Sequence, residues 1–271
     1  MRIMSNIMAL DAYRNLNITN DNLEESVEQL SSGYRINKAA DDAAGLEISN
    51  GLDAQISGLQ VASQNAQNGV NVIQTADGAL NEISSMLNRM RDLAVQASNT
   101  GTTDANAAAA DQQEVNALAA EITRESQQTA FGSNTLLDGS FVKVFQVGAN
   151  AGQYITVSLG ASLNASALGV SGLGLASVGS ASAAITAIDA AITSVSTTRG
   201  SLGAFQNRFQ SVINALGVTT QNLQSSESAI KDTDMASEMV TFNKDQILLQ
   251  AGTSMLAQAN AVPQTILKLL Q

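Results

Sequence analysis

The chain has 271 residues with a formal net charge of −11, and aromatic residues make up only 3% of it. It contains no cysteine and no histidine, which excludes disulfides and thiol chemistry and removes imidazole catalysis and most zinc sites. We therefore expect no enzyme and no cofactor. The acidic balance argues against nucleic acid or an anionic membrane as a partner. With so few large rings, we expect a thin helical bundle rather than a compact core.

Residues 3–32 are predicted to form the first helix, because apolar residues recur there at steps of three, four and seven. The row consists of Ile3, Ile7, Leu10, Leu16, Leu23 and Leu30. Gly33 follows as a left-handed cap that ends the helix. Asp41 or Asp42 can then cap a helix that begins near Ala43. Two adjacent aspartates at a helix start are far more often capping groups than a catalytic pair of carboxylates.

The chain is organised around a long helix predicted over residues 43–98. Stepping by seven along it gives an uninterrupted apolar row: Leu52, Leu59, Ala66, Ile73, Leu80, Leu87 and Ala94. Such a repeat is typical of a long helix that packs against other long helices. Gly58, Gly69 and Gly78 lie inside this helix, and each costs about 1 kcal/mol relative to alanine. They are either tolerated surface positions or points where a neighbouring helix approaches closely, and the sequence leaves both interpretations open.

A second seven-step row predicts a helix over 183–231 that packs against the first. It consists of Ile188, Val195, Leu202, Phe209, Leu216, Leu223 and Ile230. Between the two rows, Asp104 can cap a third helix that ends near Thr129. A change to period two predicts one β-hairpin near 141–159. The stretch 160–182, rich in Gly, Ala and Ser, is either a flexible surface loop or the place where a larger domain could be inserted.

The last helix is predicted to follow a cap at Asp232 or Asp234. Its seven-step row is Met235, Phe242, Leu249 and Leu256. Pro263 interrupts this row. The helices at the two chain ends thus carry apolar rows but have no place in a bundle that the inner helices already close. They could fold back, pair with each other or wait for another subunit, and the last two are favoured.

No targeting segment is recognisable. The N-terminal residues lack the apolar run of a secretory signal peptide. Uninterrupted apolar runs are too short to span a membrane. Taken alone, these residues favour a cytosolic protein.

Five blocks have a specific resemblance to a known family. Two lie in the N-terminal half: LSSGYRINKAADDAAGLEIS at 30–49 and ADGALNEISSMLNRMRDLAVQ at 76–96. The others are FQVGANAGQYITVSL at 145–159, SLGAFQNRF at 201–209, and the block over 232–270 that begins with DTDMASEMV. In this order they resemble bacterial flagellin, the subunit of the flagellar filament, over nearly the whole chain.

Two positions depart from the family pattern. The family commonly has Asn where Met4 stands, and Phe-Asn-Gly where this chain has Phe131-Gly132-Ser133. We expect the first difference to alter the packing of the chain end slightly. The second falls on a turn before the hairpin.

The resemblance implies a mainly α fold, an elongated bundle of long coiled-coil helices formed by both chain ends, with one small β-hairpin. Residues 1–42 and 232–271 would form the inner tube of a filament, and residues 43–231 a rod-like core domain around it. The plain stretch 160–182 would mark a short form without outer domains. The terminal assembly stripe would consist of Ile7, Leu10, Leu23, Leu30, Met235, Phe242, Leu249 and Leu256.

The implied function is that of a structural subunit that polymerises through its terminal helices and serves motility. Its partners would be other copies of itself, an export chaperone on residues 232–271, and the filament cap and hook-associated proteins. Export through the flagellar channel, without a cleaved signal peptide, would place it outside the cell and replace the cytosolic expectation. The chain ends would stay disordered or loosely helical in the monomer and fold on assembly.

Two rival functions and one further partner remain open. The rivals are a hook–filament junction protein of the same superfamily and a secreted helical adhesin that does not polymerise. The partner is the innate immune flagellin receptor, whose contacts in many flagellins align with Arg89, Leu93 and Glu114. From the residues alone, Arg89 and Arg91, with Asp92 beside them, would be surface charges that pair along their helix.

Overall fold

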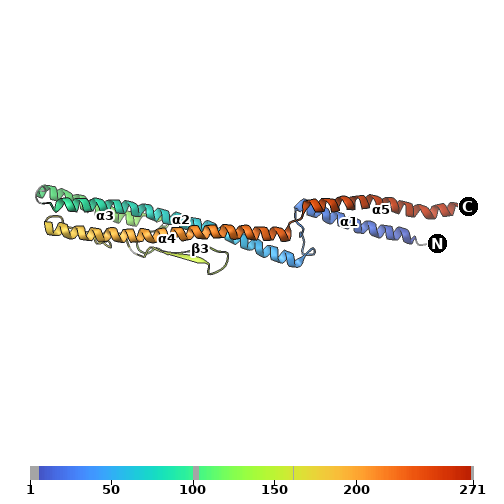
Figure 1. Cartoon of the computed structure of the whole chain (residues 1–271), viewed down its shortest axis with the longest axis horizontal. Helices are drawn as coiled ribbons and strands as arrows, with labels where there is room; N and C mark the ends of the chain where they lie inside the picture. The colour runs from blue at the N-terminus through green and yellow to red at the C-terminus, as the bar shows by residue number, and fades with distance from the viewer. Residues whose placement is uncertain (1–5, 100–103, 161, 270–271) are drawn as a thin grey trace. The chain divides into compact units, whose positions relative to one another are not determined.

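The computed structural model describes residues 6–99, 104–160 and 162–269, and the chain is mainly helical (Figure 1). The helices are α1 (Ile7–Ser32), α2 (Ala43–Ala97), α3 (Ala105–Gln128), α4 (Val178–Lys231) and α5 (Met235–Leu269). The strands are β1 (Ala130–Phe131), β2 (Asn134–Thr135), β3 (Val142–Gln146) and β4 (Tyr154–Ser158). The predicted class, long helices built from both chain ends with little sheet, is confirmed.

The chain divides into two compact units. Unit 1 contains residues 1–54 and 221–271, and unit 2 contains residues 55–220. Unit 1 is built from α1, α5 and the adjoining ends of α2 and α4. The predicted division at residues 42 and 232 concerns layers of a filament, and it stays a prediction.

The predicted caps at Gly33 and Asp104 are confirmed. Gly33 has a φ of 76°, and its N–H donates to the carbonyl of Gln29 at 2.8 Å. The carboxylate of Asp104 accepts the backbone N–H of Ala107 at 2.7 Å. Glycine has no Cβ to oppose a left-handed conformation, and an aspartate satisfies a free N–H of the first helical turn.

The adjacent aspartates before α2 divide the capping between them. Asp42 accepts the backbone N–H of Gly45 at 2.9 Å and so caps α2. Asp41 instead accepts the N–H groups of Asn37 and Lys38, which holds the preceding turn, and these hydrogen bonds lower the pKa of Asp41. Both carboxylates are therefore used by the backbone.

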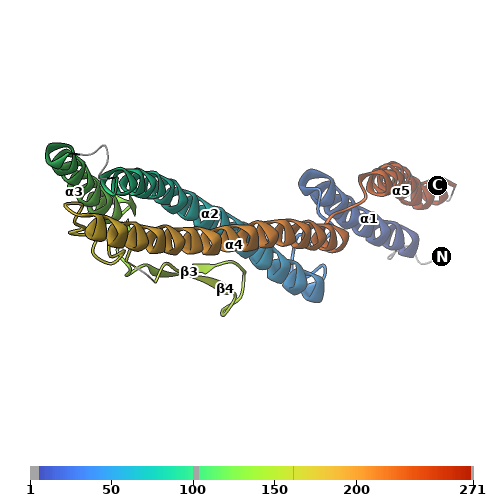
Figure 2. The same cartoon turned by 60° about the vertical axis from the view of Figure 1, so that its left-hand side comes forward.

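The two predicted apolar rows meet in the core of unit 2, where α2 and α4 cross and pack against each other (Figure 2). Every row member that belongs to this unit is buried: Leu59, Ala66, Ile73, Leu80, Leu87, Ala94, Ile188, Val195, Leu202, Phe209 and Leu216. Leu52, Leu223 and Ile230 continue the rows into unit 1 and are only half-buried there. The predicted packing of one row against the other therefore holds in unit 2.

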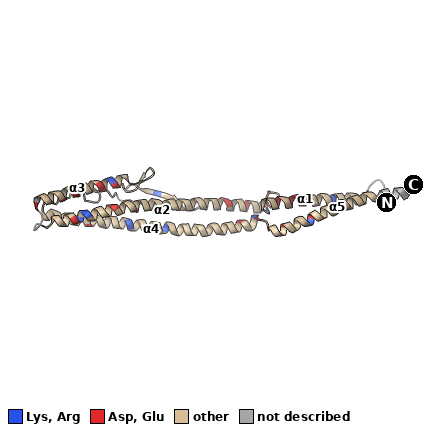
Figure 3. Cartoon of the chain, turned by 90° about the horizontal axis from the view of Figure 1, so that it is seen from above, with Lys and Arg blue, Asp and Glu red and all other residues tan. Residues whose placement is uncertain are grey.

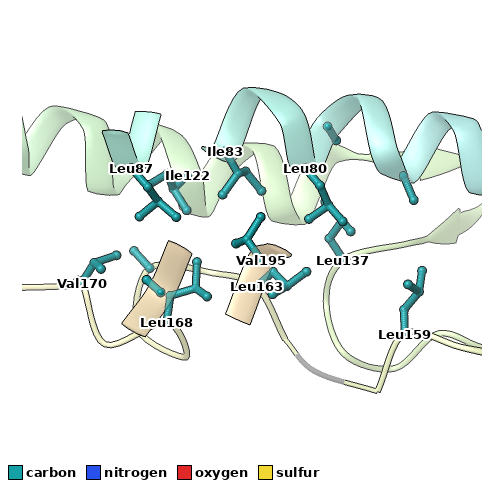
Figure 4. Packing of buried hydrophobic residues seen from close by; sticks show 14 of the residues in the cluster. Leu80, Ile83, Leu87, Ile122, Leu137, Leu159, Leu163, Leu168, Val170 and Val195 are labelled. Atoms are coloured by element: carbon teal, nitrogen blue, oxygen red, sulfur yellow. The ribbon is translucent and has the colours of Figure 1, made fainter. Parts of the chain in front are cut away.

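The stretch after the hairpin is part of the same core, so its interpretation as a flexible surface loop is wrong. Leu163, Leu168 and Val170 point toward Leu87 and Val195 (Figure 4). The side-chain amide of Gln112 on α3 also fixes this stretch, because it donates to the carbonyl of residue 173 at 2.7 Å and accepts from the N–H of residue 175 at 2.6 Å. In addition, α4 begins at Val178 rather than at 183, which shortens the stretch.

The predicted β-hairpin is present, with β3 antiparallel to β4 and Phe145 opposite Ile155. Ile155 and Val157 on its inner face are buried, whereas Val144 on its outer face is 60% exposed. A second small hairpin, β1–β2, was not predicted. Its turn contains Gly132 with a φ of 62°, which is the position where the chain departs from the family pattern.

The three glycines predicted inside α2 differ in how closely another part of the chain approaches them. A Cβ at Gly69 would lie 2.8 Å from the ring of Phe209, and one at Gly58 would lie 2.9 Å from the Cβ of Ala149 in the hairpin connection. Gly78 has nothing within 4 Å of the corresponding position. Two of the three glycines thus permit a close approach, and the third is an open surface position.

Candidate assembly surface

The helices at the two chain ends pair with each other within unit 1, one of the two arrangements that the sequence favours. Asn6 begins α1 by accepting the N–H of Ala9 at 3.2 Å, and its side-chain amide donates to the carbonyl of Ala259 on α5 at 2.7 Å. Gly252 of α5 lies so close to Leu16 that a Cβ there would be 3.1 Å from its side chain. A glycine at this point allows the two helix backbones to approach.

The cap at the start of α5 was predicted at Asp232 or Asp234, and Asp234 is the residue that forms it. The carboxylate accepts the backbone N–H groups of Ala236 at 3.0 Å and Ser237 at 3.3 Å. Glu238 in the first turn adds negative charge at the positive end of the helix dipole. Both terminal helices therefore have well-defined starts.

The predicted terminal assembly stripe divides into two groups. The first group is half-buried where α1 faces α5: Leu23, Leu30, Phe242, Leu249 and Leu256. The second group is exposed, with Ile7 at 64%, Leu10 at 63% and Met235 at 47%. A seven-step row thus contains both residues that pair the helices within one chain and residues that remain open to solvent.

Further large apolar side chains are exposed on these two helices. They are Met8, Tyr13, Ile18 and Val27 on α1, and Met239, Val240, Ile247, Leu248 and Met255 on α5. Because Val240, Ile247 and Met255 are seven and eight residues apart, they lie on one side of α5. Exposed apolar groups in this number mark a surface that another molecule covers.

Buried apolar side chains are scarce in the same unit. Among the described residues of unit 1, only Ile36 and Ala259 are buried apolar residues. Two polar residues are buried instead between α1 and α5, namely Ser26 and Asp245, each 3% exposed. Asp245 contacts the ammonium of Lys244 at 3.4 Å. The burial of these two residues was not predicted, because a polar residue within an apolar row gives no sign of being buried.

The three residues aligned with receptor contacts do not share one surface. Arg89 forms a two-pronged ion pair with Glu114 of α3, with its Nε 2.7 Å from Oε1 and its Nη2 3.2 Å from Oε2. This pairing raises the pKa of Arg89 above its usual value. Both side chains are open to solvent. Leu93, by contrast, is 2% exposed and belongs to the core of unit 2.

The expectation that Arg89 and Arg91 pair along their own helix is wrong. Arg91 contacts Asp189 of α4 at 2.7 Å. Farther along the same two helices, Arg199 of α4 contacts Asp77 of α2 at 2.8 Å. Charged residues are sparse along α2 and α4 (Figure 3), so these pairs connect the two long helices at particular positions. Pairing across helices depends on tertiary structure and is not visible in the local sequence.

By length and composition alone α4 could cross a membrane, with a mean hydropathy of 1.4 over its most apolar window. One side of α4 is buried in the core of unit 2, for example at Ala184, Ile188, Ala191 and Val195. On the remaining surface, threonine hydroxyls such as that of Thr193 donate to carbonyls one turn earlier. Packing within the chain therefore accounts for the apolar residues on the buried side of α4, and 28% of the apolar window is buried.

The paired terminal helices expose an apolar surface and have hardly any core, whereas unit 2 is well packed. This combination is typical of a subunit that completes its packing with other copies. Comparison with known proteins identifies which subunit this is. Residues 3–142 match the bacterial flagellin N-terminal helical region, and residues 185–270 match the bacterial flagellin C-terminal helical region. The chain belongs to the bacterial flagellin family.

Relatives match over their full length. The chain is 44% identical to a flagellin of Bacillus subtilis and 45% identical to a flagellin of Halalkalibacterium halodurans, with 100% of each chain covered. It is 41% identical to a flagellar filament 30.7 kDa core protein of Treponema maltophilum, again over 100% of both chains. The protein is accordingly a structural subunit of the flagellar filament rather than an enzyme, and it is located in that filament.

Solved structures agree on the fold. The crystal structure of a Bacillus cereus flagellin is 29% identical, has a TM-score of 0.51, and covers 56% of this chain and 88% of that one. A putative flagellar hook-associated protein from Vibrio parahaemolyticus has a TM-score of 0.58 and covers 71% of this chain and 100% of that one, at 16% identity. That second likeness shows a shared fold alone, so it does not support the junction-protein alternative over a filament subunit.

Proposed function

We propose that α1 and α5 drive polymerisation with two different sets of side chains. The half-buried set, which includes Leu23 and Leu249, holds the two helices together within one chain. The exposed set, which includes Leu10, Val240 and Ile247, packs against neighbouring copies in the filament interior. The observation that carries this proposal is the exposure of these large apolar groups in a unit with almost no buried core.

Burial of the exposed set between copies would supply the free energy for assembly. A fully buried Leu, Ile or Val side chain contributes about 1.5–3 kcal/mol relative to an exposed one. A few such side chains per subunit, each contacting another copy, would offset the entropy of fixing the terminal helices. The chain ends would then be loosely ordered before assembly and firmly packed after it, so that soluble monomers can be kept for export.

The experiment is seeded growth followed by negative-stain electron microscopy. Purified full-length chain is compared with a chain that lacks residues 1–30 and 242–271. We expect filaments from the full-length chain alone, and an unchanged thermal transition of unit 2 in the trimmed chain. If neither chain forms filaments and the full-length chain resists proteases at both ends, a junction protein or a non-polymerising adhesin would explain the fold better.

The remaining partners belong to the same proposal. We assign residues 232–271 to an export chaperone, because α5 exposes apolar side chains that need cover before assembly. Export runs through the flagellar channel without a cleaved signal peptide, and the filament cap and hook-associated proteins meet the subunits at the two filament ends. Co-purification of an export chaperone with the full-length chain, but not with the trimmed one, is the expected result.

A second candidate function is recognition by the innate immune flagellin receptor. The observation that favours it is the exposed ion pair between Arg89 and Glu114. Because Leu93 is buried, we assign the contact to the two charged residues and a supporting role in packing to Leu93. Arg89→Ala is expected to weaken receptor signalling, whereas Arg124→Ala, which removes an exposed ion-paired arginine of α3, is expected to leave it unchanged. Unchanged signalling in both variants would remove this function.

A further inference from the structure

The two connections of unit 1 are tied to each other by backbone contacts. Residues 33–35 lead from α1 toward α2, and they run beside the end of α4. Tyr34 forms an isolated antiparallel bridge with Asp232. The N–H of Arg35 donates to the carbonyl of Lys231 at 2.7 Å. The position of Lys231 therefore determines where residues 33–35 can pair.

The side chain of Lys231 is surrounded by groups from three segments. Its ammonium lies 3.4 Å from a carboxylate oxygen of Asp53 on α2 and 3.7 Å from one of Glu227 on α4. It also lies 4.6 Å from the centre of the Tyr34 ring, which is a cation–π distance. Lys231 and Glu227 are each 19% exposed at the side chain, whereas Asp53 is 49% exposed, so the first two are shielded from water and the third is open to it.

Negative charge exceeds positive charge in this cluster. Asp53 and Glu227 both face the single ammonium of Lys231, and the negative charge of Asp232 acts on Glu227 as well. The guanidinium of the neighbouring Arg35 is engaged elsewhere, donating to the carbonyl of residue 230 at 2.6 Å. Two carboxylates competing for one shielded cation repel each other, and a proton shared between them removes that repulsion.

The titration of the groups agrees with this geometry. Burial raises the pKa of Glu227 above its ordinary value of 4.5, and the charge and hydrogen bond of Asp53 raise it further. Burial alone would lower the pKa of Lys231, but the hydrogen bond with Asp53, together with the charges of Asp53, Tyr34 and Glu227, outweighs that effect and raises the pKa, so Lys231 stays charged. The pKa of Glu227 is thus displaced toward neutral by its surroundings in the cluster.

We propose that Asp53, Glu227 and Lys231 form a proton-dependent clamp, which is tight when the two carboxyl groups share a proton and looser when both are ionised. In the tight state, the start of α2 and the end of α4 are held to the same lysine. In the looser state, the two carboxylates separate, the end of α4 shifts, and the pairing of residues 33–35 weakens with it.

The sign of the pH dependence follows from the direction of the shift. The pKa of Glu227 in the folded chain lies above its value in an unfolded chain, so the folded state holds this proton more tightly. The stabilisation is therefore fully present below the ordinary glutamate pKa. It is lost as the pH rises through the raised pKa of Glu227.

The test measures amide hydrogen exchange of the full-length monomer between about pH 4 and pH 8, a range that brackets the ordinary pKa of glutamate. Protection factors, corrected for intrinsic exchange, are determined for the N–H groups of Arg35 and Thr233, which both donate across the junction. In the unaltered chain we expect protection to fall as the pH rises, by at most about tenfold per pH unit, the limit for one proton. Because the monomer is measured, the result does not depend on polymerisation.

Glu227→Gln is the decisive variant, since a neutral amide can still hydrogen-bond with Asp53. It is expected to keep protection high and nearly independent of pH, and Asp53→Asn is expected to flatten the same dependence. Glu47→Gln is the matched control: Glu47 is an exposed glutamate near the start of α2, and this variant should behave as the unaltered chain does. Equal pH dependence in Glu227→Gln and the unaltered chain, or no pH dependence in the unaltered chain, would overturn the clamp.

Discussion

The two units of this chain are both made of long amphipathic helices, but they use their apolar residues in opposite ways. In unit 2, the seven-step rows of α2 and α4 are buried, and the hairpin and the 162–177 stretch add further apolar side chains to the same core. In unit 1, α1 and α5 half-bury one row and leave Ile7, Val240 and Ile247 more than half exposed. Unit 2 is complete within one chain, whereas unit 1 lacks the partners for one of its surfaces.

The difference teaches what a heptad row does and does not specify. A row of apolar residues requires a partner, but it does not say whether that partner comes from the same chain. The number of neighbouring elements decides this. Around α2 there are α3, α4, the hairpin and a loop, but α1 has α5 as its main neighbour. A two-helix pair cannot surround its own apolar residues, so another copy of the flagellin subunit is needed.

The largest effect on monomer stability is expected at the centre of unit 2. Leu87→Ala removes a side chain that is 0% exposed in the core, and it should lower the free energy of unfolding by about 2–5 kcal/mol. Leu249→Ala, the matched change at a half-buried position of unit 1, should cost clearly less. Thermal unfolding followed by circular dichroism measures both. Equal losses would contradict the contrast between the units.

A smaller loss is expected from Gly69→Ala. The added Cβ would lie 2.8 Å from the ring of Phe209, which is fully buried and packs edge-on against Phe145 with ring centres 5.5 Å apart. Since the ring has no free space to move into, we expect a loss of about 1–3 kcal/mol. Gly78→Ala is the control, because nothing lies within 4 Å of its added Cβ. There a gain of about 0.4–1 kcal/mol is expected from helix propensity and reduced chain entropy.

These glycines also show how much of the fold could be predicted from the sequence. The periodicity predicted α2, α4 and their mutual packing. Composition at helix starts predicted the cap at Asp104 and a cap at Asp232 or Asp234. The sequence could not separate Gly69 from Gly78, because the difference lies in a residue 140 positions away from Gly69, namely Phe209. Local patterns specify local structure, and the identity of a contact partner depends on how the chain returns.

Dependence on distant contacts also explains the other features that the sequence did not predict. Leu163 and Val170 have no periodic neighbours, so their burial could not be read from a row. The two-residue strands β1 and β2 are too short to show alternation. In the candidate assembly surface, the seven-step rule placed Leu249 and Met235 in one stripe, although only the first faces the partner helix. Assigning the faces of a helix requires knowing the directions from which its neighbours approach.

A still smaller effect is expected for the ion pair between Arg91 and Asp189. Both side chains are about half exposed, and an exposed pair contributes about 0.2–1 kcal/mol that salt weakens. Arg91→Ala should therefore lower the melting temperature slightly at low salt and by less at high salt. A double-mutant cycle with Asp189→Ala measures the coupling. Coupling that is independent of salt would mean that the pair is shielded in solution.

The smallest effect on the monomer should accompany the largest effect on assembly. Val240 is 70% exposed on α5, and serine has a similar helix propensity, so Val240→Ser should change the free energy of unfolding by less than about 0.5 kcal/mol. If neighbouring copies bury Val240, its loss should nevertheless slow seeded filament growth strongly. Val61→Ser, which alters a 59% exposed valine of unit 2, is the matched control and should slow growth less. Equal slowing by both variants would show that unit 1 has no special part in assembly. A selective loss with Val240→Ser, at unchanged monomer stability, would separate the two uses of apolar residues, because only contacts between copies could account for it.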